Sequence, residues 1–264
     1  MFDIKAKLGF AFVVSFFLFG LILVGQSDAL KNPDSLVAAW MLDGDASDSS
    51  GNGYDGELTG GGEWMSGMHG MAVVFSNLGD TIQITDFANH VPTEEITIIV
   101  WARVDVVQNQ DLFSFDPLEI NGGRITAHLP WVDAGSAVIW QFGPNGIGAG
   151  GIDDSHIGLW EHWAFIHSAA GNYMRVLRNG EQSGMAEMSG TFIHGDGTFH
   201  IGGRPGSSFA GAIDDFAIFN TVLGDDEIMA LMNDGLMAHI GGGPTAVESS
   251  GKAATTWAHL KALK

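Results

Sequence analysis

Short stretches in which apolar and polar residues alternate, separated by clusters of glycine, recur along most of this chain. The clearest is 95–105, where apolar residues occupy the even positions from Ile96 to Val104 and therefore share one face. Ile99 and Trp101 lie on the other face, so we expect this strand to be buried on both sides at its centre. The same pattern predicts strands at 36–43, 72–77, 81–87, 95–105, 111–115, 125–130, 138–143, 162–170, 173–180, 198–203 and 211–220.

Glycine provides the turns between these strands. It accounts for 38 of 264 residues and falls mostly in short clusters between apolar runs, as in the tight turns of an all-β domain. Asn179-Gly180 is the strongest hairpin signal, because both residues tolerate a positive φ. We expect it to join a strand at 173–178 to another that starts near Glu181.

One segment, 225–234, has clear helical periodicity, with Ile228, Leu231 and Met232 on one side. Gly224 is an acceptable N-cap, and the three carboxylates that follow it suit the positive end of the helix dipole. Ten or more short strands with one terminal helix predict an all-β fold, a sandwich of two antiparallel sheets.

Four motifs, in order, resemble the laminin G-like, concanavalin A-like jelly-roll domains. They are Leu36–Gly44 with Asp48–Gly53, Ile96–Arg103, Trp160–Ala164 with Arg178-Asn179-Gly180, and Ile213-Asp214-Asp215 followed by the helix. The resemblance covers about residues 36–236, and 106–157 matches little of it. It implies a two-sheet antiparallel jelly-roll sandwich with one short C-terminal helix. It names no ligand, because this fold carries lectins, adhesion modules and glycosidases alike.

The first 29 residues have the features of a signal peptide. Lys5 and Lys7 precede an apolar run from Leu8 to Gly25, and Ser27-Asp28-Ala29 places small residues where signal peptidase cleaves. We therefore expect a secreted protein, extracellular or periplasmic. The alternative is an N-terminal membrane anchor, since the run is just long enough to span a bilayer.

The remaining chain divides into a domain at 30–240 and a tail at 241–264. The tail begins with Gly241-Gly242-Gly243-Pro244, which is typical of a linker, and ends in a basic, weakly amphipathic stretch. Either it is a frayed or back-packed terminus, or it is a docking or sorting tag.

Charge narrows the classes of partner. The formal net charge is −20, with 31 acidic and 11 basic residues, which disfavours nucleic acid and acidic membrane surfaces. The same excess of carboxylates favours hard cations such as calcium. The absence of cysteine removes thiol catalysis and thiolate metal sites.

The opening loop is rich in oxygen ligands, with Asp43, Asp45 and Asp48 among small residues. The family resemblance implies that Asp48 and Asp214 meet at one structural Ca²⁺, with Asp43 and Asp45 as additional ligands. Strand alternation places Asp214 on the face of Phe216 and Ile218, where a carboxylate needs a partner. The alternative is that both aspartates cap turns.

No catalytic machinery is evident. Related glycosidases place carboxylates two residues apart on a strand, and no glutamate here is followed two residues later by Asp or Glu. Gly-x-Ser-x-Gly does not occur, and no histidine pair has zinc-ligand spacing beside a carboxylate. We therefore expect that this protein is not an enzyme.

The poorly matched region 106–157 holds the best ligand-binding candidates, Trp131 with Asp133, because tryptophan stacks on sugar rings. The sequence thus predicts a secreted, non-catalytic module that binds carbohydrate or an extracellular protein and carries a structural calcium ion. The alternatives are a divergent glycoside hydrolase or lyase on the same fold, and a purely structural surface or matrix protein.

Overall fold

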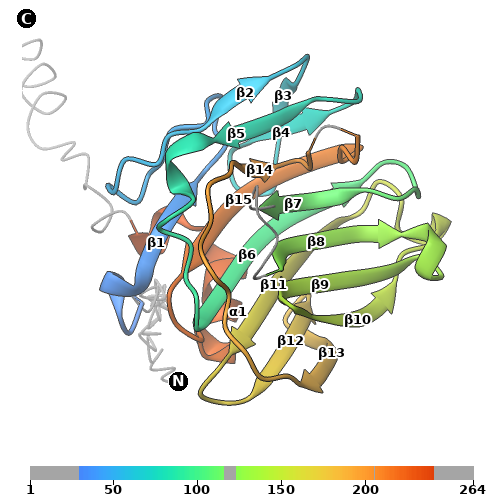
Figure 1. Cartoon of the computed structure of the whole chain (residues 1–264). Coiled ribbons are helices and arrows are strands. Elements are labelled where there is room, and N and C mark those ends of the chain that lie inside the picture. The colour runs from blue at the N-terminus through green and yellow to red at the C-terminus, as the bar shows by residue number, and fades with distance from the viewer. Residues whose placement is uncertain (1–29, 116–122, 205, 241–264) are drawn as a thin grey trace, which may run out of the picture.

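The structure is a computed structural model and describes residues 30–115, 123–204 and 206–240. Two antiparallel sheets pack face to face (Figure 1). This confirms the predicted two-sheet jelly-roll sandwich. The signal peptide predicted at 1–29 and the tail predicted at 241–264 lie outside the described residues.

The eight-stranded sheet has the order β13-β12-β11-β6-β15-β4-β3, and β1 also pairs with β15. Its strands are β1 (Leu36–Trp40), β3 (Glu63–Ser66), β4 (Met71–Phe75), β6 (Glu95–Val104), β11 (Trp160–Ser168), β12 (Tyr173–Arg178), β13 (Glu181–Glu187) and β15 (Gly211–Phe219). The long strands β6, β11 and β15 form its centre.

The seven-stranded sheet has the order β10-β9-β8-β7-β14-β5-β2. Its strands are β2 (Glu57–Thr59), β5 (Thr81–Ile84), β7 (Asp111–Phe115), β8 (Arg124–Trp131), β9 (Ala137–Gly143), β10 (Asn145–Gly151) and β14 (Phe199–Ile201). Single 3₁₀ turns occur at η1 (Pro33–Ser35), η2 (Thr85–Phe87), η3 (Val132–Ala134) and η4 (Asp154–His156).

The main core fills the space between the two sheets. Alternate residues of β6, including Ile98 and Val100, point into it, while Ile99 belongs to a second cluster on the opposite face. The sequence predicted this division. Aromatic rings from both sheets meet at the centre, where Phe113 lies edge-on to Phe216 with ring centroids 5.4 Å apart. Each such buried ring contributes roughly 1.5–3 kcal/mol.

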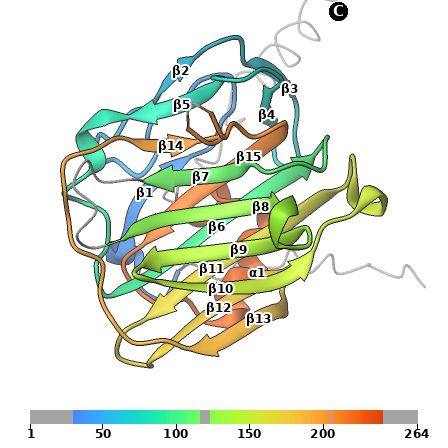
Figure 2. The same ribbon diagram turned by 45° about the vertical axis from the view of Figure 1, so that its right-hand side comes forward.

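Helix α1 (Asp225–Asp234) covers the outer face of the eight-stranded sheet. Ile228 and Leu231 are buried in the cluster that contains Ile99 and Ala217. The N-cap of α1 is Gly224, whose N–H donates to Glu227 Oε2 (3.1 Å). A second short helix, α2 (Met237–Ile240), follows α1. In Figure 2 the seven-stranded sheet faces the viewer, and within the described ranges no helix covers it.

Local signals located most elements correctly. Asn179 and Gly180 have φ values of 52° and 79°, which confirms the predicted hairpin between β12 and β13. The prediction omitted β2, β3 and β10, because β2 and β3 are only three and four residues long and β10 is largely glycine. None of the helices in the described ranges has the length and apolar character needed to span a bilayer.

Candidate functional site

The outer face of the seven-stranded sheet is polar. In β7 and β8 the residues Phe113, Phe115, Ile125 and Ala127 all belong to the core. Because side chains alternate along a strand, the residues between them point to the opposite, outer face. This is the face turned toward the viewer in Figure 2.

One row of polar residues crosses this face in register. The pairs run from Gln83 on β5 to His200 on β14, Ser114 on β7, Thr126 on β8 and Gln141 on β9. Ser114 and Thr126 are fully buried although they point away from the core, whereas the flanking residues are partly exposed. The two small hydroxyl side chains therefore form the floor of the row. We call Ser114, Thr126 and Gln141 the polar row.

The polar row has unsatisfied hydrogen-bonding groups. Ser114 Oγ, Thr126 Oγ1 and Gln141 Oε1 are each buried without a hydrogen-bond partner. A buried polar atom without a partner costs about 1–3 kcal/mol. These three atoms lie on the adjacent strands β7, β8 and β9.

A charged cluster lies beside the polar row at one end of β8. Asp111 is fully buried, and its two carboxylate oxygens contact His128 Nδ1 at 2.5 Å and Arg204 Nε at 3.0 Å. The Trp131 ring lies against the His128 ring, with centroids 4.4 Å apart. The Asp111 carboxylate is thus paired within the fold, and the partly exposed Trp131 ring packs on His128 at the edge of the face.

The structure separates the two predicted ligand residues, Trp131 and Asp133. Trp131 adjoins the polar face, but Asp133 lies beyond it in η3. Asp133 Oδ2 accepts from Asn109 Nδ2 (2.7 Å), and its N–H donates to Asn109 Oδ1 (3.1 Å). Asp133 thus ties two loops together, whereas the Trp131 ring lies at the edge of the polar face.

Asp48, predicted as a calcium ligand, organises the opening loop. Its Oδ1 accepts from the N–H groups of Ala39 and Ser50, and its Oδ2 accepts from Ser50 Oγ and the N–H of Tyr54. Burial alone raises the pKa of Asp48, but these hydrogen bonds outweigh it and hold the pKa below its ordinary value. All four acceptor positions are occupied, so Asp48 does not fit a calcium site. Asp45 is exposed and accepts from the N–H of Ser47.

Asp214 does not share a face with Phe216 and Ile218, contrary to the prediction from alternation. A bulge interrupts β15 between Asp214 and Ala217, and Asp215 has a left-handed φ of 48°. The extra residue turns Asp214 to the outer face of the eight-stranded sheet, where it is paired with Trp101.

Asp214 and Asp43 both bind the glycine turn between β3 and β4. Asp214 Oδ2 accepts from the N–H groups of Met68 (2.7 Å) and His69 (2.9 Å), and Asp43 Oδ1 accepts from that of Met71 (2.6 Å). Asp214 Oδ1 is buried and has no partner. The turn needs Gly67 and Gly70 because a Cβ at either would collide with these carboxylates.

Burial perturbs the two carboxyl groups of the bulge. Desolvation raises the pKa of Asp214 to about 6, although hydrogen bonds from His69 and Met68 oppose it. Desolvation, with smaller contributions from Asp214 and Asp43, raises the pKa of Asp215 to about 7. Asp215 Oδ2 accepts from the N–H of Leu236 (3.0 Å), which ties the bulge to the end of α1.

Of the predicted calcium ligands, the structure therefore brings Asp43 and Asp214 to one turn and places Asp45 and Asp48 elsewhere. No group of three or more His, Asp or Glu side chains within the described ranges is arranged to hold a metal ion. Asp43 and Asp214 fit a hard cation in part, because a buried carboxylate oxygen without a partner is a ready ligand.

Sequence reasoning missed the polar row. Alternation in 111–115 and 125–130 already indicated that Ser114 and Thr126 oppose the core residues of their strands. The sequence carries no signal for the pairing of β7, β8 and β9, which brings these residues together with Gln141.

A family model described as the concanavalin A-like lectin/glucanases superfamily matches residues 75–229, more than half of the chain. A search of curated proteins gives no match.

Solved structures share the fold at low sequence identity. Domain 4 of AbnA, a GH43 extracellular arabinanase from Geobacillus stearothermophilus, solved with arabinotriose, has a TM-score of 0.54 and 20% identity. It matches over 75% of this chain and 98% of its own. The binding domain of Paraclostridial Mosquitocidal Protein 1 has a TM-score of 0.59 and 20% identity, over 76% of this chain and 52% of its own. The binding domain of botulinum neurotoxin DC, solved with SialylT, has a TM-score of 0.58 and 18% identity, over 77% and 52%. This chain thus spans about half of each toxin domain. By its sequence match and its two-sheet fold, the chain belongs to the concanavalin A-like lectin/glucanases superfamily.

Proposed function

We propose that this protein is a non-catalytic carbohydrate-binding module and that the outer face of its seven-stranded sheet holds the glycan. The observation that carries the proposal is the polar row, three buried polar atoms without partners on three adjacent strands. Ligand sites place a few polar groups where they fix orientation. Sugar hydroxyl groups both donate and accept, so they satisfy hydroxyl and amide groups equally well.

The chemistry of the face favours a neutral glycan. Asp111 is already paired with His128 and Arg204, so it offers no free charge to the ligand. The net charge of −20 repels polyanions over the whole surface. Trp131 supplies an apolar ring at the edge of the face for one sugar to stack on.

Structural neighbours support a carbohydrate or a protein as the class of ligand. The arabinanase domain was solved with arabinotriose, and the neurotoxin DC domain was also solved with rat synaptotagmin II. Both carbohydrate and protein partners therefore occur on this fold. The unpaired hydroxyl and amide groups of the polar row favour carbohydrate here, because each adjacent strand adds another hydrogen-bonding group about 4.8 Å away.

We also propose a structural calcium ion beside the turn from Gly67 to Met71, with Asp43 and Asp214 as carboxylate ligands. The unpaired Asp214 Oδ1 supports this, since calcium prefers oxygen ligands. The ion would supply positive charge that lets the buried Asp214 carboxyl group ionise. We further propose that the protein is exported, because residues 1–29 have the features of a signal peptide. N-terminal sequencing of the exported protein should then begin at Leu30.

Affinity electrophoresis in gels that contain laminarin, xylan, arabinan, galactan or dextran tests the proposal, with new reducing ends measured in parallel. We expect retardation by at least one polysaccharide without new reducing ends. Trp131→Ala should weaken that retardation, whereas Trp160→Ala, on the other sheet, should not. Release of reducing ends would instead indicate a hydrolase or lyase, and no retardation by any polysaccharide would contradict the proposal.

A further inference from the structure

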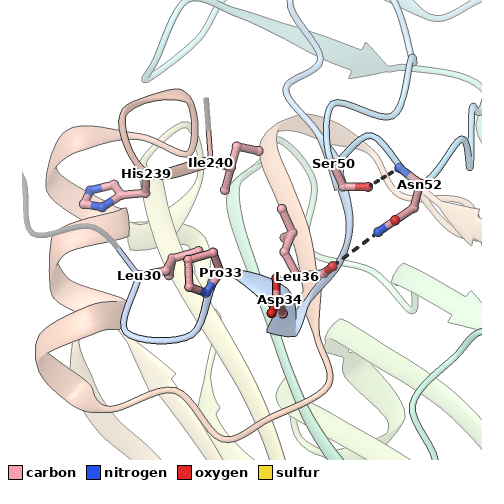
Figure 3. A pocket seen from close by; sticks show the side chains of 8 residues that line it. All are labelled: Leu30, Pro33, Asp34, Leu36, Ser50, Asn52, His239 and Ile240. Atoms are coloured by element: carbon pink, nitrogen blue, oxygen red, sulfur yellow. Dashed lines mark hydrogen bonds between the residues drawn. The ribbon is translucent and has the colours of Figure 1, made fainter. Parts of the chain in front are cut away.

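A groove runs along strand β1, on a different part of the molecule from the polar row. Two hollows of about 300 and 360 Å³ form it, and they share Asp34, Leu36 and Asn52. Figure 3 shows the first hollow, with Asp34 and Leu36 on one side and Ser50 and Asn52 on another. In Figure 1, β1 lies at the left and β7 to β10 at the right. The groove continues toward the loop at 89–93.

The loop that forms one wall is held rigidly. Asn52 Nδ2 donates to the carbonyl of Val37 (3.0 Å), so its amide takes the place of a neighbouring strand at the edge of β1. Trp40 Nε1 donates to the carbonyl of Tyr54 (2.9 Å). The Tyr54 ring lies between Phe87 of the core and His90 at the surface, with centroid separations of 5.0 and 4.9 Å. The wall is therefore preformed.

The groove presents polar groups that the fold does not use. The side chains of Asp34, Asn89 and Asn220 line it, and none of them has a hydrogen-bond partner among the described residues. Leu36 and Pro92 add apolar side chains to the same lining. A lining that combines amide and carboxylate groups with small apolar surfaces matches the hydroxyl groups and C–H faces of a sugar ring.

The size and charge of the groove restrict its ligand. Hollows of this volume lie at the lower end of the range for small-molecule sites, about 300–1,000 Å³. Asp34 belongs to both hollows, so an anionic ligand would meet a carboxylate wherever it sat. A short, neutral, polyhydroxylated ligand fits both limits.

We propose that this groove is a second carbohydrate site, for a short neutral segment or the end of a glycan chain, and that the domain bridges two glycan chains. The groove itself stands on its own geometry, whereas bridging rests on the proposed function of the polar row. Two sites on one rigid body cross-link long polysaccharides without any new contact, because each protein can hold two chains at once.

The test uses the groove variant Asn89→Ala/Asn220→Ala, the row variant Ser114→Ala/Thr126→Val and the exposed control Gln182→Ala on β13. Circular dichroism first verifies that each is folded. Isothermal titration with the oligosaccharide of whichever panel polysaccharide is retarded should give two sites for wild type and control. Each double variant should keep one site unchanged and bind at the other about tenfold or more weakly. Wild type should make the polysaccharide solution turbid, and both double variants should lose that turbidity.

The outcomes separate the two ideas. If wild type binds at one site, which the row variant abolishes and the groove variant keeps, the groove proposal is wrong and the polar row stands. If binding disappears only in the groove variant, the groove is the glycan site and the polar-row proposal is wrong. If wild type gives no binding to any of the five polysaccharides, both are overturned.

Discussion

Replacing Thr126 by valine should stabilise this protein and weaken its binding to carbohydrate. Valine has nearly the same shape as threonine, so it fills the same space on the floor of the polar row. Thr126 Oγ1 is buried without a partner, and valine removes that polar atom. An unpaired buried hydroxyl costs about 1–3 kcal/mol, so we expect a gain of roughly 1 kcal/mol in the free energy of unfolding. For a domain of this size that raises Tm by about 2–4 °C.

Binding should change in the opposite direction. A glycan hydroxyl that bonds to Thr126 loses one hydrogen bond, worth about 0.5–1.5 kcal/mol, so the affinity should fall roughly three- to tenfold. A group that costs stability and aids binding is typical of a functional site.

Thr97→Val is the matched control. Thr97 is equally buried, but its Oγ1 donates to the carbonyl of Thr221 (2.8 Å) and accepts from the N–H of Leu223 (3.1 Å). Valine at position 97 leaves two backbone groups without partners, so the free energy of unfolding should fall by about 1–3 kcal/mol. The affinity for the glycan should not change. Differential scanning calorimetry and urea unfolding measure both variants. If Thr126→Val destabilises the protein as much as Thr97→Val, the reasoning about the polar row is refuted.

Three further predictions concern the aspartates. In calorimetry, calcium should raise the Tm of wild type and of Asp225→Ala and chelator should lower it, whereas Asp214→Ala should respond to neither. A metal-free wild type whose Tm is the same in calcium as in chelator would contradict this. In excess chelator, urea unfolding should show that the free energy of unfolding falls as pH rises from about 4 to 7. The reason is that the pKa values of Asp214 and Asp215 are about 6 and 7 in the folded protein, against an ordinary value of 3.8, and a shift of two pKa units corresponds to roughly 3 kcal/mol. A free energy of unfolding that does not change with pH would contradict this prediction. Asp48→Ala should destabilise the opening loop by about 2 kcal/mol or more with or without calcium, since four hydrogen bonds disappear, and a loss seen only with calcium would restore Asp48 as a ligand.

Local sequence signals were enough to predict much of the fold. The two-sided alternation of β6, the Asn179-Gly180 hairpin and the acidic start of α1 each depend on neighbouring residues, and the structure confirms all three. β10 was missed because its glycines carry no hydrophobic pattern, and it forms a strand by pairing with β9.

The sites were harder to predict because they depend on long-range geometry. The bulge at Asp215 reverses the face of Asp214, and no local pattern announces a left-handed φ in an aspartate. Asp43 and Asp48 are both aspartates of the opening loop, and the sequence does not distinguish their roles. Asp43 accepts a hydrogen bond from Met71 in the distant turn, whereas Asp48 accepts hydrogen bonds from its own loop. The polar row exists only because β7, β8 and β9 pair in one register, and Gln141 lies far along the chain from Ser114.

The measurement that tests the central claim most directly is isothermal titration of wild type and Ser114→Ala/Thr126→Val with the polysaccharide that retards the protein most strongly. If the polar row holds the glycan, the double variant should remain folded, with equal or higher Tm, and its affinity at that site should be lower by about tenfold or more, the loss expected for two hydrogen bonds. A folded double variant that binds at both sites with affinities within twofold of wild type would contradict the account.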